Sequence, residues 1–220
     1  MNTDLKTKID NFYISCMSCS NSSDKCPGIL KDFENGLPPR GFYYKTSPVD
    51  ILVVGKNPGH PFHGESDNYR NKKGKKLFEA YRKHQDSYYN NPNIYAERSN
   101  TFHKNLFLYI SQFLVIDQKP DIIYNHIAHT NIVKCSTLDE TGKLNKMTIK
   151  ECYNNFFLTE IELFKPKVIL ALGREVEKFL NSKKDINIPI IYIKHPSYYY
   201  KAEEESEILK NIKLEIAKYL

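Results

Sequence analysis

The segment VDILVVG, residues 49–55, decides the fold, because it is a short run of β-branched apolar side chains that ends at a glycine. Such a run predicts a strand that is buried on both faces, whereas half-exposed strands alternate apolar and polar residues. Two similar runs, KVILALG at 167–173 and IPIIYIK at 188–194, each follow a segment with helical character. A fourth strand is expected at about 127–134, where the alternation is looser. Strands that alternate with helices predict a parallel sheet and an α/β fold.

The segments between these strands carry helical patterns. Thr148 and Glu151 match a capping box and predict a helix that begins at Thr148, runs to Phe164 and ends before Pro166. Residues 57–93 predict a long loop with one helix near 76–84. Apolar side chains recur at helical spacing in two further segments, and we expect them in the core: Phe102, Leu106, Tyr109, Ile110 and Phe113, and Ile208, Leu209, Ile212, Ile216 and Tyr219.

Length and composition bound the class of protein. A chain of 220 residues without a low-complexity linker is expected to form one domain, residues 1–220, and to be a monomer. No apolar run approaches the roughly 18 residues that cross a bilayer, so we expect no membrane association. The N-terminus has no apolar stretch of signal-peptide length, which predicts a cytoplasmic protein with reduced thiols.

The charge balance says little about the partner. Lys and Arg outnumber Asp and Glu by 32 to 26, a formal net charge of +6, and this excess weakly favours a polyanionic partner. The basic run NKKGKK at 71–76 is either a phosphate-contacting loop or, as is commoner for such runs, a solvated surface face.

The five cysteines point to metal ligation. An odd number of thiols in a cytoplasmic chain argues against a disulfide framework, and Cys16 and Cys19 have the C-x2-C spacing at which two thiolates can face one centre. Cys135 ends an expected strand, and Cys152 falls in the first turn of the expected helix, where the helix N-terminus would lower the pKa of a thiol. Ordinary buried cysteines, a four-sulfur zinc site and an iron–sulfur cluster all fit this spacing. Cys26 is a spare thiol or replaces one of the other four.

The central part of the chain resembles the iron–sulfur uracil-DNA glycosylases. The segments HTNIVKC at 129–135, EC at 151–152 and KPKVILALG at 165–173 match the family's central block, in which an asparagine lies four residues before the third cysteine. The resemblance extends to HPSY at 195–198 and GKNPG at 55–59, which are similar to the second and first motifs of the superfamily. It implies a three-layer α/β/α domain with a central four-stranded parallel sheet. It also implies a [4Fe-4S] cluster held by four residues: Cys16, Cys19, Cys135 and Cys152.

The two motifs follow the first and last strands, at the carboxyl edge where open α/β sheets bind ligands. The family's chemistry is the hydrolytic removal of a flipped base from DNA, which leaves an abasic site. By resemblance, His195 donates a hydrogen bond to pyrimidine O2, Asn57 orients the water, and Asn131 reads the base. The alternatives are a surface histidine, a turn residue before a proline, and a satisfied polar residue at a strand end.

Further residues acquire expected roles from the same resemblance. Phe62 is expected to stack on the flipped base, although a loop phenylalanine is as often part of the core. The rest of the first motif is expected in the substrate pocket: Gly55, Lys56, Pro58 and Gly59. The segment after His195 is expected to enter the minor groove of DNA or to pack beneath its own loop: Pro196, Ser197, Tyr198 and Tyr199.

Two departures from the family loosen the substrate prediction. The iron–sulfur members usually have GEAPG in the first motif, whereas GKNPG resembles the mismatch-specific glycosylases, and Gly59 replaces the tyrosine that excludes a 5-methyl group. A proline-rich stretch after the third cysteine is also replaced, by STLDE at 136–140. We therefore expect uracil or a modified pyrimidine in DNA as the substrate. Two other hypotheses are a cluster-bearing DNA-binding damage or redox sensor and a zinc-stabilised α/β domain of unrelated function.

Overall fold

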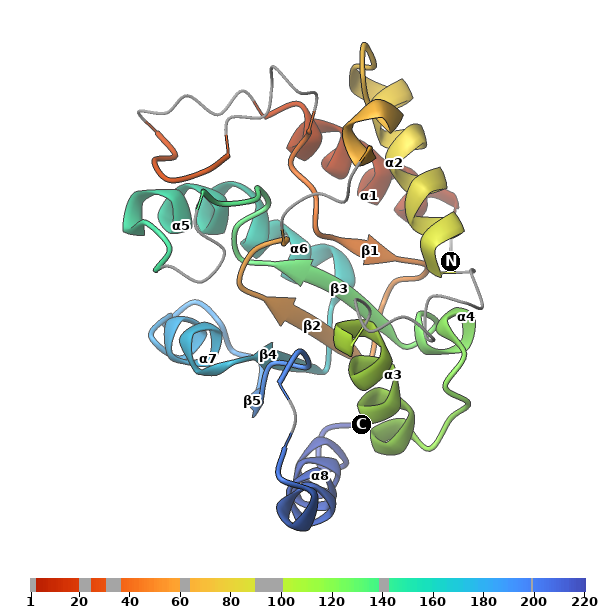
Figure 1. The fold of residues 1–220 in the computed structure, drawn as a ribbon, viewed down its shortest axis with the longest axis vertical. Helices are drawn as coiled ribbons and strands as arrows, with labels where there is room; N and C mark the ends of the chain where they lie inside the picture. The colour runs from red at the N-terminus through yellow and green to blue at the C-terminus, as the bar shows by residue number, and fades with distance from the viewer. Residues whose placement is uncertain are drawn as a thin grey trace.

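The computed structural model describes residues 3–19, 25–30, 37–59, 64–89, 101–138, 143–198 and 200–220. Its centre is a five-stranded sheet with the order β1-β3-β2-β4-β5 (Figure 1). Four strands run parallel and lie within the four predicted segments: β2 (Ile51–Gly55), β3 (Ile127–Asn131), β4 (Val168–Leu172) and β5 (Ile190–Ile193). The prediction of a four-stranded parallel sheet is confirmed, with one addition. A two-residue strand, β1 (Tyr43–Tyr44), pairs antiparallel with β3 at the edge.

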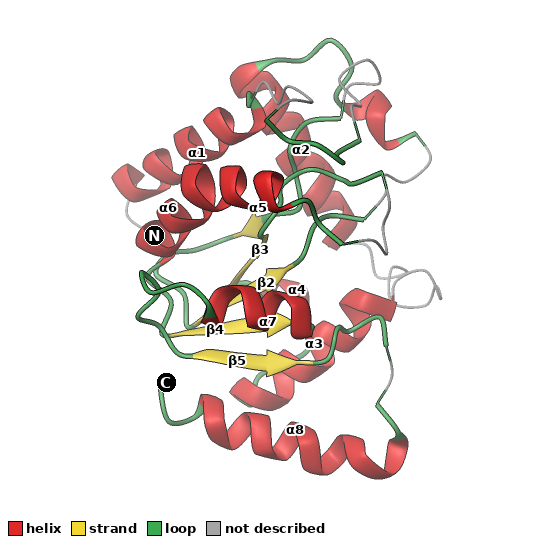
Figure 2. Ribbon diagram, turned by 90° about the vertical axis from the view of Figure 1, so that its left-hand side faces the viewer, coloured by secondary structure: helices red, strands yellow, loops and turns green. Residues whose placement is uncertain are grey.

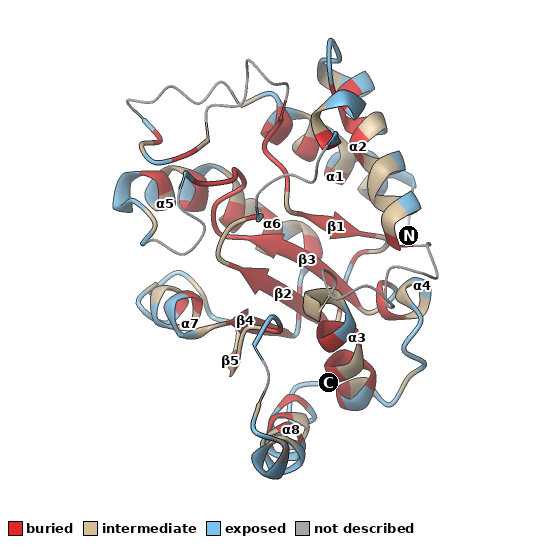
Figure 3. Ribbon diagram, in the orientation of Figure 1, coloured by how far each residue is buried: buried red, intermediate tan, exposed pale blue. Residues whose placement is uncertain are grey.

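Helices cover both faces of the sheet, which makes the domain three-layered. Leu52 and Val54 of β2 pack toward α1 (Thr3–Met17), α2 (Gly74–Tyr89), α6 (Leu158–Phe164) and α7 (Arg174–Asn181). Ile51 and Val53 pack toward α3 (Thr101–Leu114), α4 (Pro120–Ile123) and α8 (Ala202–Ile216). In Figure 2 the strands lie between α1 and α6 above and α8 below. Because both faces are covered, β2, β3 and β4 are buried throughout (Figure 3), which explains the unbroken apolar character of β2 and β4.

The predicted capping box is wrong, although the end of that helix is correct. The cap is Asn145, whose side chain accepts from the backbone N–H of Met147 at 2.9 Å, and α5 spans Lys146–Cys152. Thr148 is buried inside the helix, and its hydroxyl donates to the carbonyl oxygen of Pro27 at 2.7 Å instead of capping. The chain continues through a π-helical turn, Tyr153–Phe157, into α6, which ends at Phe164 as predicted.

The segment predicted as a long loop contains more helix than expected. Within its described part, a 3-10 helix spans Glu65–Asn68, and α2 extends beyond the predicted residues 76–84 at both ends. The basic run at 71–76 is largely exposed. The core predictions hold with three exceptions: Phe102 and Ile208 are only partly buried, and Tyr219 lies beyond the end of α8 and is 42% exposed.

Candidate active site

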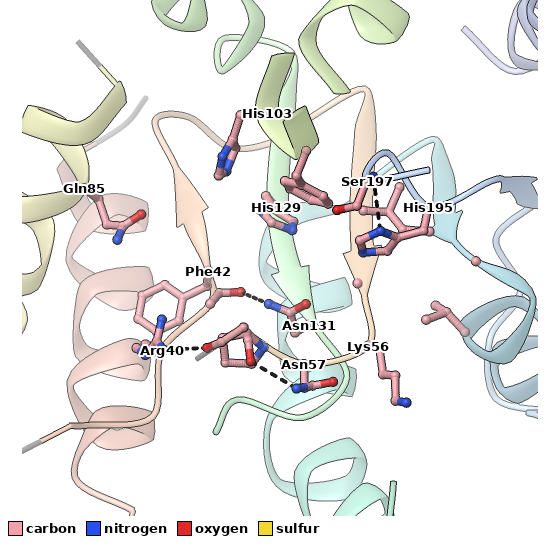
Figure 4. A pocket seen from close by; sticks show the side chains of 18 of the residues that line it. Arg40, Phe42, Lys56, Asn57, Gln85, His103, His129, Asn131, His195 and Ser197 are labelled. Carbon is pink, nitrogen blue, oxygen red and sulfur yellow. Dashed lines mark hydrogen bonds between the residues drawn. The ribbon is translucent and has the colours of Figure 1, made fainter. Parts of the chain in front are cut away.

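A cavity of about 590 Å³ opens at the carboxyl edge of the sheet. Its walls come from the segments that follow β2, β4 and β5, from the end of β3, from α2 and the N-terminal turn of α3, and from the segment before β1. Nine of the residues predicted for the site line it: Gly55, Lys56, Asn57, Pro58, Gly59, Asn131, His195, Ser197 and Tyr198. The prediction that the two motifs meet at one strand edge is therefore confirmed as geometry (Figure 4).

Of the other three predicted residues, the structure describes only Pro196, which does not line the cavity. Pro196 is buried, and its carbonyl oxygen accepts from the Asn105 side-chain amide at 2.8 Å, so it fastens the loop to α3. Phe62 and Tyr199 lie outside the described residues.

The carboxamide of Asn131 is held in one orientation between two glycines. Its Nδ2 atom donates to the carbonyl oxygen of Gly41 at 2.6 Å, which leaves Oδ1 turned the other way, toward Gly55. A Cβ atom added to Gly41 would collide with Nδ2, and one added to Gly55 would collide with Oδ1. Gly41 also has a φ of +82°, a conformation that residues with a side chain rarely adopt. Both glycines are thus required for the position of this amide.

Asn57 is oriented by its own amide hydrogens. Its Nδ2 atom donates to the carbonyl oxygen of Pro58 at 3.0 Å and to Oγ1 of Thr137 at 3.2 Å. Since an amide nitrogen has two hydrogens, both are used, and the Oδ1 atom is the group left to interact with a ligand. The neighbouring Lys56 forms an ion pair of 3.1 Å with Glu175 on α7, at the rim of the cavity.

His195 presents a hydrogen-bond donor. Its Nδ1 atom accepts from the backbone N–H of Ser197 at 3.3 Å, and burial lowers the pKa of its imidazole. The ring is therefore neutral at pH 7, and its single proton is on Nε2. Phe102 packs against it with a centroid separation of 5.2 Å, and Tyr198 lies 6.0 Å away on another side. The Nε2–H group is thus held in a fixed direction by contacts around the ring.

The protein-family model described as "Uracil DNA glycosylase superfamily" matches residues 42–217. The chain belongs to the uracil DNA glycosylase superfamily. Membership supports a DNA glycosylase-type function, with DNA as the substrate. The matched range includes the cavity residues of both motifs together with Cys135 and Cys152, and it leaves out Cys16, Cys19 and Cys26. No curated protein matches the chain. In the described part of this superfamily member, no helix is long and apolar enough to cross a membrane.

Several residues of the glycosylase cavity were missed from the sequence. Phe102 was expected in the core, yet it lines the cavity and contacts both His129 and His195, with centroid separations of 5.7 and 5.2 Å. The sequence predicts no role for His129, although it lies two residues before Asn131 and therefore on the same face of the strand. Arg40 donates to the carbonyl oxygen of Gly59 at 2.6 Å and so fixes the first motif. No local pattern marks that arginine in the sequence.

A closed polar network lies on the opposite face of β3 from the cavity. Lys134 and Glu160 are fully buried and form an ion pair of 2.7 Å. Glu160 also accepts from Thr130 and from Tyr13, each at 2.8 Å. The Lys134 ammonium donates to Thr130 Oγ1 at 2.7 Å and to the carbonyl oxygen of Asn131. The network therefore ties the carboxyl end of β3 to α1 and α6.

The cysteines lie near this network, and none forms a disulfide. Cys16, Cys26, Cys135 and Cys152 are buried in the core cluster on this side of the sheet, and Cys19 is partly buried. Burial, and to a smaller extent the charge of Cys152, raises the pKa of Cys16, Cys19 and Cys26. These thiols are therefore within electrostatic range of one another, Cys26 included.

The expectation of a lowered thiol pKa at Cys152 is wrong. This residue is the seventh and last of α5, so the helix N-terminus does not face it. Burial raises its pKa, while a backbone hydrogen bond from Lys134 and the charge of that side chain act in the opposite direction. Among the described residues, no three His, Cys, Asp or Glu side chains are grouped as they would be around a single metal ion.

Proposed function

We propose that this protein is a monofunctional DNA glycosylase that flips uracil or a modified pyrimidine out of DNA and hydrolyses its N-glycosidic bond. The observation that carries the proposal is the pair His195 and Asn131, a fixed donor and a fixed amide that open into the same cavity. A flipped base needs contacts on its polar edge and a place for the negative charge that it takes away. These two side chains are suited to supply both.

His195 would act as the donor to pyrimidine O2. As the N-glycosidic bond breaks, negative charge develops on the base, and the Nε2–H of a neutral, oriented imidazole stabilises it without reorganisation. A donor of this kind contributes about 100- to 1000-fold to the rate. Phe102 and Tyr198 hold the ring in place for this role.

Asn131 would discriminate uracil from cytosine. Because Nδ2 faces Gly41, Oδ1 is directed to accept from N3–H, and the second hydrogen of Nδ2 can donate to O4. Cytosine has a lone pair at N3 and an amino group at C4, so it would meet the same amide with the reversed pattern. Gly59 has no side chain to cover C5, which supports the inclusion of 5-modified pyrimidines.

Asn57 would position the attacking water. An amide oxygen can accept a hydrogen bond from water but cannot serve as a strong base, so the reaction would depend on stabilisation of the leaving group. The two hydrogen bonds of Nδ2 support this role, because they leave Oδ1 in a defined direction.

Base stacking and DNA insertion would come from aromatic residues around the cavity. Phe102 is a candidate stacking face in addition to the predicted Phe62, because it lines the cavity and contacts His129 and His195. Tyr198 is 62% exposed and follows the fastened Pro196, which supports its insertion into the minor groove.

Cys16, Cys19, Cys135 and Cys152 would hold a [4Fe-4S] cluster, with a structural zinc ion as the alternative. Their burial, partial for Cys19, and their mutual electrostatic influence support a sulfur-liganded group, and Cys26, which Cys152 and Cys19 also influence, is the candidate to replace one of the four. When bound, such a group stabilises the fold, because ligation is coupled to folding. Absorbance near 400 nm from the purified protein would support the cluster, whereas a colourless protein that releases zinc on acidification would support the alternative.

The function is tested with labelled oligonucleotides that contain U:G, U:A, T:G or a 5-modified cytosine, followed by alkali. We expect strand cleavage at one or more of these bases by the wild-type protein and little or none by the H195A variant. If every substrate stays intact while the protein still binds the oligonucleotides, the glycosylase proposal is wrong and the DNA-binding sensor becomes the better hypothesis.

A further inference from the structure

One buried nitrogen in the cavity has no hydrogen-bond partner. His129 is 8% exposed, and its Nε2 atom is buried without a partner in the structure. The side chain comes from β3 and lines the same cavity as Asn131 and His195, above Asn131 and to the left of His195 in Figure 4. A Cβ atom added to Gly55 would collide with Asn131 Oδ1 and lie 3.8 Å from His129 Nε2. The free nitrogen therefore lies beside the amide that is proposed to read the base.

An unpartnered buried nitrogen is costly. Leaving a polar atom without a hydrogen bond in the interior costs about 1–3 kcal/mol, and nearly all such atoms in folded proteins are paired. A second histidine of the same cavity, His103, shows the paired case. Its Nδ1 and Nε2 atoms lie 3.1 and 3.2 Å from the hydroxyl oxygens of Tyr88 and Tyr89. Histidines that line the cavity are therefore not unpaired in general, and a ligand could supply the partner that Nε2 of His129 lacks.

We propose that His129 is a further substrate-binding residue, whose Nε2–H donates to a carbonyl oxygen on the Watson–Crick edge of the flipped base, beside the contacts of Asn131. This inference rests on the proposed function. A donor fits better than an acceptor, because the departing base becomes negatively charged. Burial, with the nearby His195 and Lys134, lowers the pKa of His129 to about 4, so the imidazole is neutral at pH 7 and has one N–H to give.

The test compares H129L and H129Q with wild type. Leucine fills a similar volume without polar atoms, and glutamine restores a side-chain N–H. Since Nε2 has no hydrogen bond to lose in the free protein, we expect H129L to keep or raise the melting temperature. We also expect it to lower the single-turnover excision rate and the affinity for free uracil about 10- to 100-fold, the range for one buried hydrogen bond. H129Q should recover part of both losses.

H126Q is the matched control. His126 precedes the same strand at the opposite edge of the sheet, where its Nδ1 atom lies 2.8 Å from Asp50 Oδ2. We expect this variant to excise and bind uracil as the wild type does.

The outcomes separate the inference from the proposed function. If the wild type excises a base and H129L matches it in rate and in uracil affinity, the inference is wrong and the glycosylase stands. A fall in melting temperature that accompanies the loss in both variants would assign His129 a structural role and also overturn the inference. If the wild type excises nothing, the proposed function fails, and the affinity for free uracil tests His129 alone. Weaker uracil binding by H129L than by the wild type supports the contact, and equal or absent binding overturns it.

Discussion

The two faces of β3 differ in whether their polar side chains are fully hydrogen-bonded within the protein. On one face, Thr130 joins the Lys134–Glu160 pair in a network in which the buried groups bond one another. On the other face, Asn131 keeps its Oδ1 atom toward the cavity and His129 keeps an unpartnered nitrogen. The strand is equally buried on both sides, so burial alone does not distinguish them. The polar groups on the first face are hydrogen-bonded by protein partners and stabilise the fold, whereas those on the second face have atoms free to bind a ligand.

Disrupting the buried Lys134–Glu160 pair should have the largest effect on stability. E160A removes the partner of a fully buried ammonium, and an uncompensated buried charge costs about 3–5 kcal/mol of unfolding free energy. Urea unfolding measures this change. The double variant K134M/E160L removes both charges and should recover part of the loss, because apolar side chains of similar volume replace the pair.

The contrary result for this pair would be a double variant as unstable as the sum of its two single variants. Such additivity would mean that the two side chains do not interact. The buried polar groups on this face of β3 would then form a set of separate contacts and not a network.

Removing a hydrogen-bond donor from the cavity should affect chemistry more than stability. H195A removes the Nε2–H donor, and we expect the single-turnover excision rate to fall about 100- to 1000-fold. The melting temperature and the affinity for uracil-containing DNA should change little. An unchanged rate would refute the role of His195, and a large loss of DNA affinity would show that it mainly binds DNA.

The same contrast explains how much could be predicted from the sequence. Unbroken apolar runs predicted three of the parallel strands, from 49–55, 167–173 and 188–194, and a looser alternation predicted the fourth, from 127–134. The carboxyl ends of parallel strands meet at one edge, so the convergence of Asn57, Asn131 and His195 on one cavity also followed. These features depend on local pattern and on a general rule of topology.

The features that were missed depend on tertiary contacts. A two-residue strand such as β1 has too few residues to show a period. Asn145 and Thr148 are both competent caps, and the carbonyl of Pro27, distant in sequence, takes the Thr148 hydroxyl. Phe102 has the helical spacing of the core residues, but it lies in the first turn of α3, where this face of the helix lines the cavity. Whether His129 is paired could not be read from its neighbours in sequence.

Lowering the pH should reduce the free energy of unfolding, because His129 is held neutral in the folded protein. The folded-state pKa of His129 is lowered to about 4, by burial first, whereas an unfolded histidine titrates near 6.5. The unfolded state therefore binds more protons between these values. The contribution of the neutral ring is complete above about pH 6.5 and is lost as the pH falls toward 4, by about 3 kcal/mol.

Urea unfolding at a series of pH values tests this slope. H129L should flatten it relative to the wild type, and the remaining slope should include His103, whose pKa burial lowers to about 3. Equal slopes in H129L and the wild type would show that His129 is not held neutral by the fold.

The smallest expected effect concerns Gly55, which lies against Oδ1 of Asn131 and near Nε2 of His129. G55A places a methyl group against Asn131 Oδ1 and near His129 Nε2, and overpacking of this kind costs about 1–3 kcal/mol. The collision is with Asn131 alone at close range, so G55A should cost much less stability in an N131A background. A double-mutant cycle measured by urea unfolding gives this coupling directly. If the cost of G55A is the same in both backgrounds, the glycine is required by the backbone of β2 and not by the amide. In that case the orientation of Asn131 would rest on the Gly41 hydrogen bond, and G55A would leave discrimination between uracil and cytosine intact.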